Sequence, residues 1–181
     1  TLQRGVGHAS SSADILSALR ASAFALGKSV PSRWLCHLAS AVEPTNPCLI
    51  KGACFFDPDN GNILGNYHSR LPLRVEILRC GEQVDTVDFQ RKRVPWSPKN
   101  EREFRCIIGD LSDALASGTP KHIASAATRS ALLHAERYER QDILDAISQA
   151  KCSGALGIAV SHSGSSIVSL YPPRAEKEMH A

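Results

Sequence analysis

The sequence predicts an α+β fold in which helices pack on one face of an antiparallel sheet. Three observations support this class: apolar residues recur at helical spacing in several segments, short apolar runs lie between them, and turn-forming residues join neighbouring runs. The 181 residues are 43% hydrophobic and 22% charged, which is typical of a globular protein with a sizeable core. This composition excludes the disordered and collagen-like classes. The membrane-spanning class is excluded because no apolar run reaches the roughly 20 residues that cross a bilayer.

The first part of the chain predicts two helices and a hairpin. The serines at 10–12 can cap the first helix, and the second should end before Pro44, because the residue before a proline leaves the helical region. Asp57–Gly61 contains the Pro, Asn and Gly residues that suit a reversing turn between two strands. The expected elements are helices over Ala13–Leu26 and Ser32–Val42 and strands over Ala53–Phe56 and Asn62–Gly65.

The remainder predicts a strand, three helices and a final strand pair. Pro95 and Pro98 break any long element in the polar stretch Gly81–Pro98, which is expected to be irregular. Gly118 ends one helix and Pro120 occupies the first turn of the next. The expected elements are a strand over Leu73–Leu78, helices over Asn100–Ala116, Pro120–Tyr138 and Gln141–Ala150, and strands over Ala155–Val160 and Ile167–Leu170.

The stretch Gly7–Asp14 places a glycine, small residues and three serines directly before an amphipathic helix. Helix N-termini present unpaired N–H groups and partial positive charge, so small residues there let a phosphate approach the backbone. The stretch lacks the lysine and glycine spacing of a P-loop and does not fit the dinucleotide pattern. From the residues alone, a phosphate cradle and a simple serine-rich helix cap both remain open.

Three blocks, in matching order, resemble the GHMP kinases, which include galactokinase, homoserine kinase, mevalonate kinase and phosphomevalonate kinase. Gly7–Ile15 is similar to the second motif of that superfamily, and is closest to the branch of L-threonine kinases that serve cobalamin synthesis. Val42–Asn46 is similar to the E-P-T-D segment of the branch, and Ala159–Ser165 is similar to its C-terminal glycine motif. The segment Val84–Phe89 also resembles this branch. The departures are Gln3 at the usual proline, His8 at the usual large apolar residue and Asn46 at the usual aspartate.

The resemblance implies a site for ATP and Mg²⁺, since phosphoryl transfer depends on positioning and on neutralising charge. The residues expected to bind the nucleotide phosphates are Gly7, His8, Ala9, Ser10, Ser11 and Ser12. Those expected to hold Mg²⁺ are Ser10, Ser11 and Glu43, and those expected to contact the small substrate or its phosphate are Ser163, Gly164 and Ser165. Without the resemblance, we would interpret Glu43 as an exposed carboxylate in a loop.

The general base is the least defined role. Asp57 is the candidate by position, although its place before Pro58 also suits a turn former, and some family members, such as homoserine kinase, manage without a base. His162, beside the glycine turn, reads as a structural residue or as an acid or base. His8 reads as a nucleotide contact or as a surface substitution.

The resemblance also implies a two-domain GHMP kinase-like fold with a ferredoxin-like C-terminal domain. Residues 1–66 are expected to be the remainder of the ATP-binding N-terminal domain and residues 67–181 the C-terminal domain. The family carries further strands before its second motif, and the only methionine here is Met179. We therefore expect the chain to be an internal piece of a longer kinase.

The expected function is an ATP-dependent kinase that phosphorylates a hydroxyl, with L-threonine as the leading substrate. Alternatives are a homoserine or isoprenoid-alcohol kinase, a non-catalytic remnant or binding module, and a structural protein whose serines only cap a helix. A formal charge of +3 is too small for a nucleic-acid footprint, and six scattered cysteines suggest free thiols in a reducing cytoplasm. We expect a small-molecule substrate and no nucleic-acid or membrane partner. A homodimer is one assembly that the chain could form.

Overall fold

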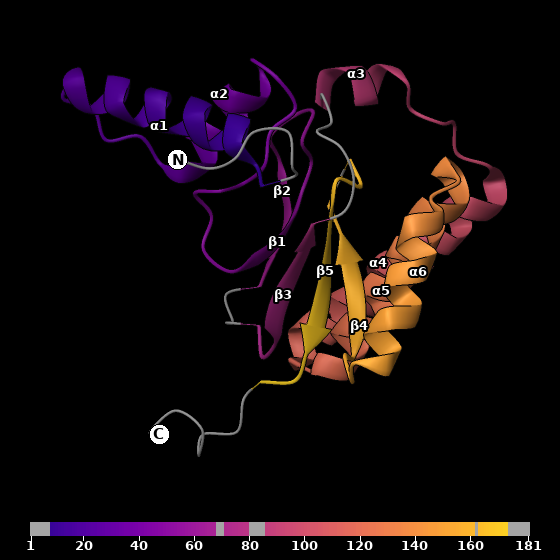
Figure 1. Cartoon of the computed structure of the whole chain (residues 1–181). Coiled ribbons are helices and arrows are strands. Elements are labelled where there is room, and N and C mark those ends of the chain that lie inside the picture. The colour runs from indigo at the N-terminus through magenta and orange to yellow at the C-terminus, as the bar shows by residue number, and fades with distance from the viewer. Residues whose placement is uncertain (1–7, 68–70, 80–85, 162, 174–181) are drawn as a thin grey trace. The chain divides into compact units, whose positions relative to one another are not determined.

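The computed structural model describes residues 8–67, 71–79, 86–161 and 163–173, which form two compact units, residues 8–67 and 71–173. Helices and antiparallel strands are mixed along the chain, so the predicted α+β class is confirmed (Figure 1). Within the described ranges, no helix is long and apolar enough to span a bilayer.

The first unit consists of two helices and a two-stranded hairpin. These elements are α1 (Ser10–Ala25), α2 (Ser32–Ser40), β1 (Ala53–Phe56) and β2 (Ile63–Tyr67). The core of the unit forms where α1 meets α2, and its buried members are Leu16, Leu35, Cys36 and Ala39. The strands β1 and β2 pair antiparallel, as the apolar runs around the turn predicted.

The turn between β1 and β2 packs directly on α2. Gly61 has a φ of +72°, in the left-handed region, and a Cβ added to it would lie 2.5 Å from the Cα of His37. The Nδ1 of His37 lies 2.8 Å from the carbonyl oxygen of Asn60. Glycine is therefore required at position 61 for both its backbone angle and its lack of a side chain.

The second unit is a three-stranded antiparallel sheet with helices. Its elements are β3 (Arg74–Arg79), α3 (Thr86–Arg91), α4 (Pro98–Ser117), α5 (Pro120–Tyr138), α6 (Gln141–Cys152), β4 (Gly157–Val160) and β5 (Ser166–Tyr171). The strand order is β3-β5-β4, so the last strand in the sequence lies in the middle of the sheet. In Figure 1, α4, α5 and α6 lie together beside this sheet.

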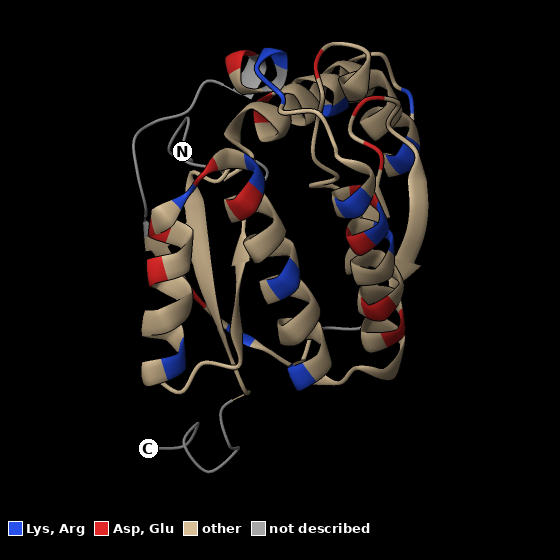
Figure 2. Cartoon of the chain, turned by 90° about the vertical axis from the view of Figure 1, so that its right-hand side faces the viewer, with Lys and Arg blue, Asp and Glu red and all other residues tan. Residues whose placement is uncertain are grey.

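The helices α5 and α6 share one apolar core with the sheet. Ile158 of β4 and Ile167 of β5 are fully buried against small and branched residues of these two helices, whose buried members are Ala131, Ala135, Ile143, Ala146, Ile147 and Ala150. Thr128 of α5 joins helix to strand, because its hydroxyl donates to the carbonyl of Ala124 at 2.8 Å and accepts from the N–H of Ile158 at 3.0 Å. Figure 2 shows Lys and Arg interspersed with Asp and Glu along the helices.

The prediction of an irregular Gly81–Pro98 stretch is wrong where α3 forms. Asp88 near the start and Arg91 at the end of α3 suit the helix dipole and lie 3.9 Å apart. Phe89 contacts the rings of Tyr138 and His134 on α5 with centroid distances of 5.1 and 6.3 Å. This tertiary contact of one aromatic ring anchors a short helix that an otherwise polar sequence does not signal.

The helix starts also differ from prediction. The serines at 10–12 were expected to precede the first helix, but α1 begins at Ser10 and its N-cap is Ala9, which makes no side-chain cap. Pro98 does not break a helix; it occupies the first turn of α4, where Ser97 caps the helix by accepting the N–H of Asn100 at 3.1 Å. The helix Pro120–Tyr138 has the predicted bounds.

Candidate functional site

The amino end of α1 has no side-chain cap among the described residues. Ala9 has a φ of 54° in the left-handed region, which is rare for a residue with a side chain and is typical of strained functional segments. Neither Ala9 nor another described side chain caps this end, so the first backbone N–H groups of the helix remain available as donors. Gly7, the first residue of the expected cradle, lies outside the described residues, and His8 is half-buried.

The structure brings Ser11 and Glu43 together although 32 residues separate them in the sequence. The hydroxyl of Ser11 donates to the Oε1 of Glu43. Ser11 is exposed and Glu43 is half-buried, so both oxygens lie where a ligand can reach them. Ser10 occupies the first position of the helix and is half-buried.

Ser12, by contrast, has a structural partner. It is buried, and its hydroxyl accepts from the backbone N–H of Asn46 at 2.9 Å, with the Nδ2 of Asn46 at 3.5 Å. Asn46 stands where the family has aspartate, and here its amide groups tie the loop that carries Glu43 to the first turn of α1. Sequence reasoning noted this residue only as a lost charge.

Backbone hydrogen bonds hold the loop that carries Glu43. The N–H of Glu43 donates to the carbonyl of Ala39 at 3.2 Å, at the end of α2, and the N–H of Thr45 donates to the carbonyl of Pro58 at 3.2 Å. Thr45 is buried, and its hydroxyl has no hydrogen-bond partner among the described residues. The loop therefore places Glu43 against α1 through bonds to both α2 and the hairpin turn.

Asp57 forms the hairpin turn. Its carboxylate accepts from the backbone N–H of Asp59 at 3.0 Å and of Asn60 at 3.2 Å, and from the Nδ2 of Asn60 at 2.7 Å. The side-chain bond from Asn60, followed by these backbone bonds, lowers the pKa of Asp57 below its ordinary value. A carboxylate with a lowered pKa and occupied oxygens is a weak proton acceptor, so the geometry favours the turn-forming role.

The predicted substrate loop lies in the second unit, between β4 and β5. Ser163, Gly164 and Ser165 are all buried, and the hydroxyls of the two serines lie 2.8 Å apart. Gly164 has a φ of +72°, and its N–H donates to the carbonyl of Ser161 at 2.9 Å. The other candidate in this motif, His162, lies outside the described residues.

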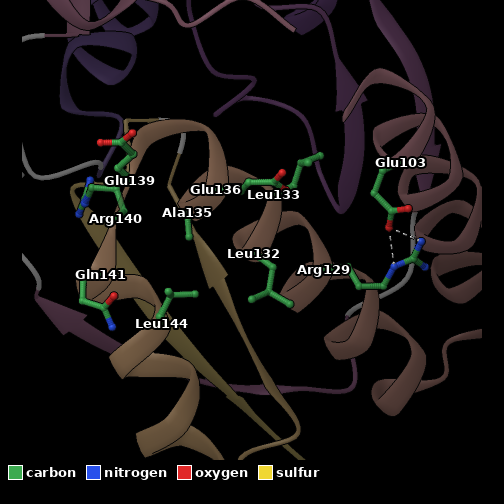
Figure 3. Close-up of a pocket in the computed structure, with 10 residues that line it drawn as sticks. All are labelled: Glu103, Arg129, Leu132, Leu133, Ala135, Glu136, Glu139, Arg140, Gln141 and Leu144. Atoms are coloured by element: carbon green, nitrogen blue, oxygen red, sulfur yellow. Dashed lines mark hydrogen bonds and ion pairs between the residues drawn. The ribbon is translucent and has the colours of Figure 1, made fainter. Parts of the chain in front are cut away.

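A cavity of about 540 Å³ lies among α4, α5 and α6 (Figure 3). Leu132 and Leu144 contribute apolar surface to it, and Arg129 and Arg140 contribute charge. Both arginines already bind carboxylates, Arg129 to Glu103 and Asp110, and Arg140 to Asp142. None of the residues predicted to carry the site lines this cavity.

Two observations bear on metals and thiols. Among the described residues, no three His, Cys, Asp or Glu side chains gather as a metal cage. Mg²⁺ commonly takes one or two protein carboxylates together with substrate phosphates, and Glu43, bonded to Ser11, is one such carboxylate. The five cysteines that the structure describes are free, and burial raises the pKa of Cys36, Cys48 and Cys54, which disfavours reactive thiolates.

Two known proteins are similar to most of this chain. An L-threonine kinase from Citrobacter freundii is 25% identical over 166 residues, which cover 91% of this chain and 58% of the relative. The crystal structure of homoserine kinase from Cytophaga hutchinsonii matches 96% of this chain and 59% of its own with a TM-score of 0.73 and 20% identity. Both similarities support the GHMP kinase family. No family model matches the sequence.

The structural similarity confirms the expected fold, and the sequence similarity supports the expected family, because each extends over nearly all of the chain. The chain spans less than two thirds of the length of either protein. The roles of individual residues in binding ATP, Mg²⁺ or substrate stay predictions. The motif comparison missed Arg140, because no local pattern indicates that it bonds to Gly164 in the glycine loop, and it also missed Asp142, which pairs with Arg140.

Proposed function

We propose that this chain provides part of an ATP-dependent kinase that transfers the γ-phosphoryl group to the hydroxyl of a small molecule, with L-threonine as the leading substrate. The product would be O-phospho-L-threonine for the cobalamin side chain. The observation that carries the proposal is the hydrogen bond between Ser11 and Glu43, because it joins two blocks of the GHMP pattern at an open helix end. The similarity to an L-threonine kinase favours threonine over homoserine.

The chain's own residues would bind the nucleotide at the start of α1. The free N–H groups of the first turn and the helix dipole favour the phosphates, and the small side chain of Ala9 leaves room for them. The backbone strain at Ala9 is consistent with a cradle whose shape is set in advance. The hydroxyl of Ser10 could add a further donor.

Mg²⁺ fits the donors present. The carboxylate of Glu43 and the hydroxyl of Ser11 are hard oxygen ligands, and they already meet in the folded chain. When bound, Mg²⁺ neutralises the charge that develops on the phosphate oxygens. Glu43 and Ser11 would hold it, and the bonds of Asn46 to Ser12 would keep the loop of Glu43 against the helix.

The hydroxyl substrate would contact the Ser163–Ser165 loop of the second unit. The turn bonds of Asp57 make it a poor base, so positioning and charge neutralisation would supply most of the catalysis. The proposal also includes location in a reducing cytoplasm and assembly as a homodimer.

The test is a phosphoryl-transfer assay with radiolabelled ATP, Mg²⁺ and a panel of L-threonine, L-serine, L-homoserine and mevalonate. We expect transfer to L-threonine to exceed transfer to the other alcohols, and Glu43→Gln to abolish it. Ser17→Ala is the matched control, because Ser17 is exposed on α1 outside the site. Binding of ATP by the folded chain with no transfer to any alcohol would contradict the kinase and support a binding module.

A further inference from the structure

Arg140 stands between two helices, and its backbone is fixed there. Glu139 ends α5 in the left-handed conformation, with a φ of 51°, and Arg140 is the N-cap of α6. The N–H of Arg140 donates to the carbonyl of Ala135 at 3.0 Å, which closes the end of α5. The guanidinium therefore projects from an anchored backbone.

The carboxylate of Asp142 fixes the guanidinium in turn. Nε of Arg140 lies 2.7 Å from Oδ1 of Asp142, and Nη2 lies 2.6 Å from Oδ2. Two parallel bonds between a planar guanidinium and a carboxylate define one orientation of the arginine. The bonds from Arg140 are also the main reason that the pKa of Asp142 is lowered.

The oriented guanidinium reaches the glycine loop 24 residues away. Nη2 of Arg140 donates to the carbonyl oxygen of Gly164 at 2.9 Å. A Cβ added to Gly164 would lie 2.6 Å from Nη1 of Arg140 and 2.8 Å from Nε2 of His134. The loop is thus packed against a charged side chain, with no room behind it.

We propose that Arg140, oriented by Asp142, is the positioning residue that sets the conformation of the Ser163–Gly164–Ser165 loop. By holding the Gly164 carbonyl, it fixes the backbone between the two buried serines, whose hydroxyls lie 2.8 Å apart. This inference rests on the proposed function for the role of the loop in substrate binding. The hold on the loop itself does not depend on that function.

Arg129 offers a matched control. It lies on α5 and also binds carboxylates, and Figure 3 shows it at the opposite end of the cavity from Arg140. Neither Arg129 nor its partners Glu103 and Asp110 make a hydrogen bond to the glycine loop among the interactions described. Arg129→Gln removes an ion-pair network of similar chemistry without touching Gly164.

The experiment measures amide hydrogen exchange by NMR and steady-state kinetics in the full chain. The reporters are the N–H of Gly164 and the N–H of Ser166, which donate to Ser161 at 2.9 and 3.0 Å. Arg140→Gln should speed exchange at both amides about tenfold, which corresponds to losing one charge-assisted bond. Arg140→Lys should have a smaller effect, Asp142→Asn one smaller still, and Arg129→Gln none beyond its change in overall stability.

Kinetics separate loop positioning from a purely structural role. The KM for the hydroxyl substrate should rise most in Arg140→Gln, by about tenfold, less in Arg140→Lys and least in Asp142→Asn. The KM for ATP should stay unchanged in all three variants. Unchanged exchange with a raised KM would mean that Arg140 contacts substrate directly, and would overturn the proposal. If the wild-type chain phosphorylates nothing, the proposed function fails while the exchange data still decide whether Arg140 holds the loop. If Arg140→Gln does not fold, Arg140→Lys and Asp142→Asn provide the same comparison.

Discussion

The two serine-rich segments of this chain, Ser10–Ser12 and Ser163–Ser165, are held in place differently. At the first, Ser11 is exposed and bonds to a half-buried carboxylate, and no side chain in the described part of the chain caps the helix end. At the second, every residue is buried, and Arg140, which is paired with Asp142, donates a hydrogen bond to the backbone carbonyl of Gly164. The first segment keeps donors and acceptors that a ligand can take over, whereas Gly164 in the second has no room for a side chain.

This difference matches the different demands of the two roles proposed above. A site that binds a nucleotide and a cation must exchange its own hydrogen bonds for bonds to the ligand. A loop that forms one wall of a substrate site gains precision when surrounding residues fix its shape. Changes at the second segment should therefore cost stability, and changes at Ser11 or Glu43 should cost mainly binding.

The largest effect is expected for Gly164→Ala. A methyl group would collide with Arg140 and His134, and the φ of +72° disfavours any side chain, so the free energy of unfolding should fall by about 2–4 kcal/mol. Urea denaturation followed by circular dichroism measures this loss. The control is Gly109→Ala in α4, where a Cβ meets nothing within 4 Å. It should raise stability by about 0.5–1 kcal/mol, and equal effects of the two substitutions would refute the packed loop.

An intermediate effect is expected for Ser12→Ala. Its hydroxyl accepts the backbone N–H of Asn46, and removing a buried acceptor should lower the free energy of unfolding by about 1–2 kcal/mol. Ser11→Ala should change it by less than about 0.5 kcal/mol, because Ser11 is exposed. Chemical denaturation of both variants checks the order. A larger loss for Ser11→Ala would mean that the Ser11–Glu43 contact is structural rather than poised for a ligand.

The smallest effect concerns pH. Because the pKa of Asp142 is lowered in the folded chain, its contribution to stability is complete above the ordinary carboxyl pKa of about 4 and is lost as the pH falls through the lowered value. The Tm difference between wild type and Asp142→Asn should stay constant from pH 7 to about 5 and shrink below about 4. The difference corresponds to less than about 1 kcal/mol, since the carboxylate is partly exposed. A difference that grows at low pH would contradict the paired Asp142.

The sequence was sufficient for elements with local signals. Pro120 and the apolar stripe after it predicted the bounds of α5, and Asp57–Gly61 predicted the hairpin. The helix α3 was missed because it depends on Phe89 packing against rings of α5. Local propensity carries no information about such a contact.

The candidate site also has features that the sequence predicted and features that depend on the fold. The Ser11–Glu43 pair was expected from a family motif, since no periodicity relates residues 32 positions apart. Gly164 was expected as a loop glycine, but its collision partner Arg140 could not be predicted, because the end of α5 meets the β4–β5 loop only in the folded unit. The structural role of Asn46 also depended on the fold, since its partner Ser12 lies 34 residues away.

The most direct test of the account is calorimetric titration of the folded chain with ATP, with and without Mg²⁺. We predict binding that requires Mg²⁺ and that Ser11→Ala and Glu43→Gln each weaken by about tenfold or more, while Ser17→Ala leaves it unchanged. Binding that is equally tight in all variants, or a folded chain that binds no nucleotide, would contradict the assignment of the open end of α1 as the nucleotide and metal site.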